Sequence, residues 1–113
     1  MPQNVRALSQ YSTAEVRNVF ATGRLAFKNS GMTVLYATRV KNFGRILVVT
    51  SRKVGNSPAR NLIRRRLKAL FYEEQWHLLL YDFVFIIRTP ATEYSFEKLK
   101  SLCTGFITRL KAA

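Results

Sequence analysis

The chain of 113 residues is about as long as one domain, and its hydrophobic content of 48% is enough for one core, so we expect a single domain spanning residues 1–113. Its 19 Lys and Arg residues against 6 Asp and Glu residues give a formal net charge of +13 at pH 7, which favours a polyanionic partner such as the phosphate backbone of nucleic acid. No apolar run reaches the roughly 20 residues that cross a bilayer, and the one cysteine, Cys103, excludes an intrachain disulfide, so we expect a soluble cytoplasmic protein with no membrane partner.

The first elements are predicted from local signals. Residues 1–11 show no clear period and predict an irregular basic arm. Ser12 and Glu15 have the S-x-x-E spacing of a capping box, which predicts a helix over about residues 13–22. We expect Gly23 to end this helix in the left-handed conformation that glycine adopts without steric cost.

Two segments rich in β-branched residues follow. The segments 32–40 (MTVLYATRV) and 45–51 (RILVVTS) predict two antiparallel strands joined by a turn at residues 42–44. A shorter strand is predicted over residues 25–28.

The second half of the chain alternates helix and strand. Ser57 followed by Pro58 predicts a helix from Pro58 at least to Glu74, with the proline at the first helical position. The apolar run at residues 82–88 (DFVFIIR) predicts a strand that lies centrally or is covered on both faces, and a last helix is predicted over residues 96–110. The order α-β-β-β-α-β-α with a βαβ crossover predicts an α+β fold, a two-layer sandwich in which helices pack on one face of a mixed sheet.

The segment 52–68 (RKVGNSPARNLIRRRLK) is the most informative stretch. Five of its 17 residues are Arg, two are Lys and none is acidic. A turn of about 100° per residue separates a polar side from an apolar side that holds Ala59, Ile63, Leu67 and Leu70; the polar side holds Arg60, Asn61, Arg64, Arg65 and Lys68. A merely solvated helix face usually mixes charges of both signs, whereas like charges four residues apart repel, so the pattern favours RNA or DNA binding.

The segment 51–71 (SRKVGNSPARNLIRRRLKALF) resembles the RNR motif of the bacterial ribonuclease P protein subunit, and the strand YDFVFIIR at residues 81–88 extends the resemblance to nearly the whole chain. The resemblance implies a ribonuclease P protein-like fold and a role as accessory subunit of an endoribonuclease. In that family a catalytic RNA removes the 5′ leader of precursor tRNA with magnesium held mainly by RNA. The resemblance therefore implies that this chain has no catalytic residue, metal site or cofactor of its own. It also implies one copy of this chain per catalytic RNA. The single histidine, His77, and the scattered carboxylates agree with this reading.

The resemblance also implies site residues. Gly55 is expected to supply the backbone angle of a tight loop, and Phe20 and Tyr36 match aromatic positions of a cleft between the first helix and the sheet that receives the leader; both are also compatible with simple core roles. Val16 stands where an aromatic residue is usual, and Tyr11 or Phe27 could substitute for it. The RNA-binding residues implied are Arg52, Lys53, Arg60, Asn61, Arg64, Arg65, Arg66, Lys68 and Arg88.

The motif departs from the family pattern at two positions. The family usually has arginine at the position of Leu62 and leucine at that of Arg66, so this chain exchanges the pair. Because residues four apart are neighbours on a helix, one hypothesis is that Arg66 replaces the guanidinium lost at Leu62.

Two other functions compete with this reading. A small basic ribosomal protein, or another RNA-assembly protein, would explain the charge but not the motif spacing. An autonomous ribonuclease would require a catalytic constellation that the sequence does not contain.

Overall fold

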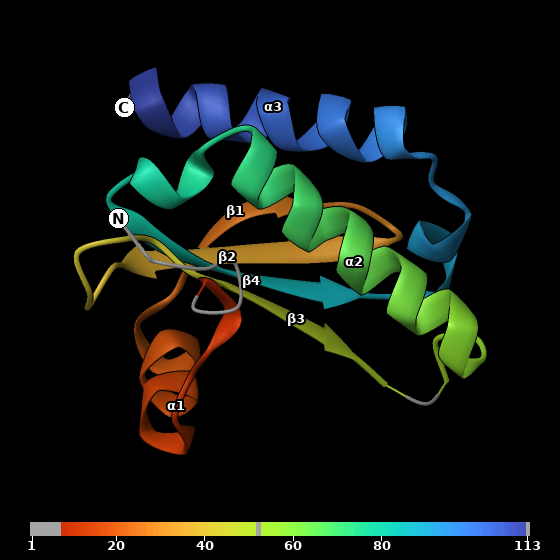
Figure 1. The fold of residues 1–113 in the computed structure, drawn as a ribbon, viewed down its shortest axis with the longest axis horizontal. Coiled ribbons are helices and arrows are strands. Elements are labelled where there is room, and N and C mark those ends of the chain that lie inside the picture. The colour runs from red at the N-terminus through yellow and green to blue at the C-terminus, as the bar shows by residue number, and fades with distance from the viewer. Residues whose placement is uncertain (1–7, 52, 113) are drawn as a thin grey trace.

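The elements follow the predicted order. A computed structural model describes residues 8–51 and 53–112, so most of the predicted basic arm lies outside the described residues (Figure 1). Short 3₁₀ helices at Trp76–Leu78 and Thr89–Glu93 flank the last strand. The main elements are α1 (Thr13–Thr22), β1 (Arg24–Lys28), β2 (Met32–Thr38), β3 (Ile46–Thr50), α2 (Ser57–Glu73), β4 (Tyr81–Ile87) and α3 (Phe96–Ala112).

The four strands form one mixed sheet in the order β1-β2-β4-β3. Strand β4 pairs antiparallel with β2 and parallel with β3. The predicted pairing of β2 with β3 across a turn is therefore wrong: the two strands run in opposite directions, but β4 lies between them (Figure 1). The reason is the crossover through α2, which returns the chain beside β3 in the same direction, and the apolar run of β4 suits this central place.

Helices cover both faces of the sheet. Helices α2 and α3 lie on one face and α1 on the other, so the expectation that all helices pack on one face is correct for α2 and α3 and wrong for α1 (Figure 1). The core fills the face under α2 and α3, where the ring of Phe83 lies 6.0 Å from that of Phe71 and 6.4 Å from that of Phe106. Trp76 and Cys103 are buried in the same core, as predicted.

The start of α1 confirms the predicted capping box. The Ser12 hydroxyl accepts from the Glu15 backbone N–H at 3.1 Å, and the Glu15 carboxylate accepts from the Ser12 N–H at 2.9 Å. The left-handed conformation predicted for Gly23 is wrong, because its φ of −65° is ordinary extended backbone. Its N–H donates to the Val19 carbonyl at 2.8 Å, and a Cβ at Gly23 would lie 2.6 Å from that oxygen, so the close approach requires the glycine.

The start of α2 differs by one residue from the prediction. The capping residue is Asn56, whose side-chain oxygen accepts from the Ala59 N–H at 2.9 Å, and this places Pro58 at the second helical position. Asparagine is as good a cap as serine, and the helix still tolerates proline within its first turn. Gly55, just before the cap, has a φ of +86°, which confirms the predicted tight loop.

The single histidine is a core residue. His77 is buried, and its ring stacks on Tyr72 at 5.5 Å. Neither ring nitrogen has a hydrogen-bond partner among the described residues. Burial lowers the pKa of His77 from its ordinary value of 6.5, because the charged form cannot be solvated.

This burial predicts a pH-dependent stability. As the pH falls through 6.5, the unfolded chain takes up a proton at His77 before the folded chain does, so the free energy of unfolding falls. His77→Phe keeps a stacked ring without a proton to gain, and we expect its urea midpoint to change less between about pH 7.5 and about pH 5.5 than that of the wild type. Equal changes in the two proteins would contradict the assignment of this step to His77.

Candidate RNA interface

The orientation of α2 is fixed by its apolar side. Ile63, Leu67, Leu70 and Phe71 are buried in the core. The other side carries a shallow hollow of about 560 Å³, and we call the polar residues that line it the α2 basic face: Asn61, Arg64, Arg65 and Lys68. The structure thus brings together four of the five residues that the helical spacing placed on one side.

No carboxylate of the described residues forms an ion pair with the α2 basic face. The ion pairs among the described residues join Arg45 to Glu15 and Asp82, and Lys100 to Glu74. Arg64 donates to the Thr50 hydroxyl at 2.6 Å, which orients it beside β3 without cancelling its charge. Two cations one turn apart, Arg64 and Lys68, repel each other unless an anion lies between them.

The other residues of the motif lie in or near the loop before α2. Arg60, the fifth predicted residue of the polar side, donates to the Gly55 carbonyl at 2.9 Å and to the Ser57 hydroxyl at 3.0 Å, so it braces the start of the helix. Lys53 is exposed in the loop. Arg52 lies outside the described residues.

Arg66 has a different environment from the α2 basic face. Its guanidinium donates to the Tyr94 carbonyl at 3.0 Å and so ties α2 to the segment before α3. Leu62, one turn earlier, is 37% exposed. The structure gives Arg66 a partner in the protein and adds no support for the exchange hypothesis, and an RNA contact by Arg66 stays a prediction.

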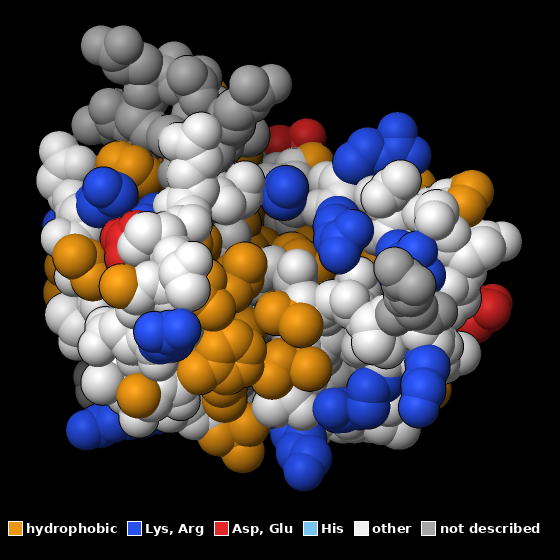
Figure 2. Space-filling model, turned by 90° about the horizontal axis from the view of Figure 1, so that it is seen from below, with side chains coloured by type: hydrophobic (Ala, Val, Ile, Leu, Met, Phe, Trp, Pro, Cys, Tyr) orange, Lys and Arg blue, Asp and Glu red, His pale blue; other side chains and the backbone are white. Residues whose placement is uncertain are grey.

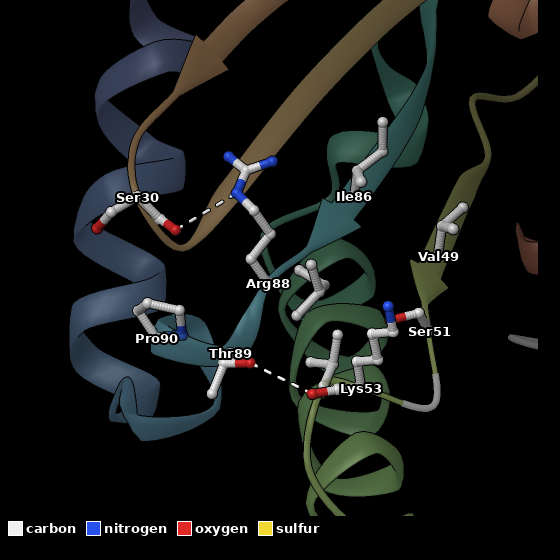
Figure 3. Close-up of a pocket in the computed structure, with 10 residues that line it drawn as sticks. Ser30, Val49, Ser51, Lys53, Ile86, Arg88, Thr89 and Pro90 are labelled. Atoms are coloured by element: carbon white, nitrogen blue, oxygen red, sulfur yellow. Dashed lines mark hydrogen bonds between the residues drawn. The ribbon is translucent and has the colours of Figure 1, made fainter.

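Arg88 is also held by the protein. It donates to the carbonyls of Asn29 at 2.7 Å and Ser30 at 3.3 Å and to the Thr33 hydroxyl at 2.9 Å. These bonds fix the turn between β1 and β2. Figure 3 shows Arg88 and Lys53 at one hollow of about 480 Å³, whose other lining residues are mainly apolar.

The sheet face beside α1 is partly open. Figure 2 shows hydrophobic side chains gathered in the middle of this face, with Lys and Arg side chains beside them on the right. The strand register shows which half-buried apolar side chains form the floor of this face: Leu35, Leu47, Val49 and Ile86. Sequence reasoning missed these residues because their alternation along apolar strands looks the same as that of core positions.

The two predicted leader aromatics have different surroundings. Tyr36 pairs with Phe83, so it points to the core face, where its ring meets that of Tyr81 edge-on at 5.2 Å. It does line a hollow with Asn18 and Thr22 of α1, but Phe20 is not among the lining residues. A leader contact by Phe20 and Tyr36 stays a prediction.

Phe20 nevertheless remains available, since it is 43% exposed on α1. The two suggested substitutes for an aromatic at Val16 are both engaged elsewhere. Phe27 stacks on Phe106 at 5.6 Å, and the ring of Tyr11 lies 4.2 Å under the Arg45 guanidinium.

Comparison with known proteins decides the family. Residues 6–111 match the family described as Ribonuclease P. The chain belongs to the ribonuclease P protein family. A ribonuclease P protein component of Clostridium kluyveri is 31% identical over 99 residues, covering 85% of this chain and 88% of the relative. That of Petrotoga mobilis is 29% identical over 101 residues, covering 85% of each.

The fold agrees with solved ribonuclease P proteins. The Staphylococcus aureus structure aligns with a TM-score of 0.78 at 21% identity and covers 92% of this chain and 95% of that one. The Thermotoga maritima structure aligns with a TM-score of 0.75 at 19% identity and covers 89% and 96%. These confirm the predicted α+β ribonuclease P protein-like fold.

Family membership fixes the general role of the chain. A ribonuclease P protein component is a subunit of the ribonucleoprotein that processes tRNA 5′ ends, and the catalytic role lies in its RNA. This confirms the predicted accessory role over that of a ribosomal protein or an autonomous ribonuclease. The helices of the described residues are each too short or too polar to span a bilayer.

The contact made by Arg66 predicts a loss of stability. Arg66→Leu removes the hydrogen bond to the Tyr94 carbonyl, and we expect the free energy of unfolding in urea to fall by about 1 kcal/mol. Arg65→Leu, at an exposed position of the same helix, should change it by less than about 0.5 kcal/mol. An Arg66→Leu protein of wild-type stability would contradict this structural role.

Proposed function

We propose that the α2 basic face is the surface that binds the catalytic RNA. The observation that carries the proposal is the hollow in which Arg64, Arg65 and Lys68 gather without a carboxylate of the described residues in an ion pair with any of them. A guanidinium group can donate two parallel hydrogen bonds to the oxygens of one phosphate. The negative charges of RNA phosphates would also relieve the mutual repulsion of the three cations.

We further propose that the open sheet face beside α1 receives the single-stranded 5′ leader of precursor tRNA. An apolar floor suits unstacked bases, and the cations Lys53 and Arg88 at one end suit the backbone that joins them (Figure 3). Phe20, exposed on α1, offers a ring on which a base can stack.

We propose that the magnesium ions of the reaction are held mainly by RNA. The residues present do not fit a protein-held ion, because no three His, Cys, Asp or Glu side chains of the described residues are grouped as metal ligands. Two of the six carboxylates, Glu15 and Asp82, are bound to Arg45 instead.

The first proposal is tested with a pair of matched double variants. The double variant Arg65→Gln, Lys68→Gln removes one arginine and one lysine from the α2 basic face. The control variant Arg109→Gln, Lys111→Gln also removes one arginine and one lysine, but from exposed positions of α3. We expect only the first variant to bind a bacterial ribonuclease P RNA more weakly and to lose the rescue of precursor tRNA cleavage at low magnesium.

The salt dependence of binding reports how many phosphate contacts each variant loses. Each lost phosphate contact should lower the slope of log affinity against log salt concentration by about 0.7 to 0.9, so the first double variant should lose up to about 1.8. Equal slopes for the two double variants would place the RNA elsewhere on the protein.

The leader proposal predicts an effect of Phe20→Ala. Loss of one stacked base should weaken holoenzyme binding of precursor tRNA by roughly fivefold or more, whereas binding of mature tRNA should not change. Leu80→Ala, which truncates another exposed apolar side chain, is the control. If Phe20→Ala leaves precursor binding unchanged, Phe20 does not contact the leader.

A further inference from the structure

Arg45 is one of two fully buried charged side chains among the described residues, and the other is its partner Asp82. The Arg45 side chain lies between strand β3 and the residues before α1. It donates to the Gln10 carbonyl at 2.7 Å and lies 4.2 Å over the ring of Tyr11. The same guanidinium pairs with Glu15 at 2.8 Å and with Asp82 at 3.4 Å. One side chain thus joins the segment before α1, the first turn of α1 and strand β4.

The cluster uses scarce acidic residues. The chain has 6 acidic residues for 19 cations, yet Glu15 and Asp82 both converge on Arg45 and not on the α2 basic face. Asp82 is fully buried and also accepts from the Arg45 backbone N–H at 2.9 Å. The hydrogen bond from Arg45 lowers the pKa of Glu15 to about 2, so this carboxylate stays charged at neutral pH.

Helix α1 has few other attachments. Val19 is its one buried side chain, and α1 stands apart from the other two helices on its own side of the sheet (Figure 1). Val19 holds the second half of the helix, and the bond from Arg45 to Glu15 holds the first turn. Two separate anchor points are what a short helix needs to keep a fixed angle to the sheet. Without the second, the first turn of α1 loses its tie to Arg45, while the last turn stays joined to β1 through Gly23.

We propose that Arg45 is a positioning residue: by tying Glu15 of α1 to Asp82 of β4, it sets α1 beside the open sheet face and thereby sets the affinity for the precursor tRNA leader. The inference rests on the proposed leader site. It does not involve helix α2, which lies on the opposite side of the sheet from α1 (Figure 1), so binding of the catalytic RNA to the α2 basic face should not depend on it.

The variant that tests this is Glu15→Gln. Arg45→Ala would leave two carboxylates facing each other without a cation and is expected to unfold the chain. Glutamine keeps the size of Glu15, and its oxygen can still accept from the Ser12 N–H in the capping box. Its NH2 group then replaces the oxygen that pairs with Arg45, so Glu15→Gln breaks the bond from Arg45. The control is Ser12→Ala, which removes the bond that the Ser12 hydroxyl accepts in the capping box and leaves the bond from Arg45 to Glu15.

Two readouts are needed, both well below the unfolding temperature. The first is the distribution of distances between spin labels at Ala21 on α1 and Ser101 on α3, measured on the protein alone; both positions are exposed. The second is the ratio of holoenzyme affinities for precursor tRNA and mature tRNA, together with the affinity for the catalytic RNA.

We expect Glu15→Gln to broaden the label distances and to lower the affinity ratio by about fivefold, with unchanged catalytic RNA affinity, while Ser12→Ala changes neither readout. Unchanged label distances in Glu15→Gln overturn the positioning role. A broadened distribution with an unchanged ratio overturns the link to the leader. A wild-type holoenzyme whose ratio is one overturns the proposed leader site itself, and the label distances still decide whether Arg45 positions α1.

Discussion

The rest of the structure depends on one packing constraint, the burial of the apolar side of α2 against the sheet. Ile63, Leu67 and Leu70 can reach the core only if the helix lies across β3 and β4 in one rotation. That rotation leaves Arg65 and Lys68 facing outward, where no carboxylate of the described residues pairs with them. The hydrophobic contact therefore holds mutually repelling cations side by side on the surface, as the proposed contact with RNA phosphates requires.

The sheet separates the two proposed binding surfaces. One face carries the core under α2 and α3, and the α2 basic face lies outside it (Figure 1). The other face keeps a half-buried apolar floor beside α1 and has cations at its edge (Figure 2). The carboxylates follow the same division, because Glu15 and Asp82 pair with Arg45, whereas no carboxylate of the described residues pairs with the α2 basic face. Catalytic RNA and leader could thus bind without competing for one surface.

Signals that act within a few residues were predictable from the sequence, and contacts between distant residues were not. The capping box of α1 spans four residues, and the residues of the α2 basic face recur every three to four positions, so both were predictable from the sequence. The place of β4 between β2 and β3 depends on the crossover, and the partner of Arg66, Tyr94, is 28 residues away. No residue near Arg45 in the sequence indicates that it will pair with Asp82, 37 residues later. Phe20 and Tyr36 were matched to family positions, but the sequence did not show that Tyr36 pairs with Phe83.

The most direct measurement of the central claim is photo-crosslinking from the two helices that cover the same face of the sheet. A photoreactive residue at Asn61, in the α2 basic face, should crosslink to the catalytic RNA in the assembled holoenzyme, at defined nucleotides and with a yield that falls as salt rises. The same residue at Thr104, exposed on α3, should give little or no crosslink. Crosslinks from Thr104 with none from Asn61 would contradict the account, because the RNA would then lie on α3.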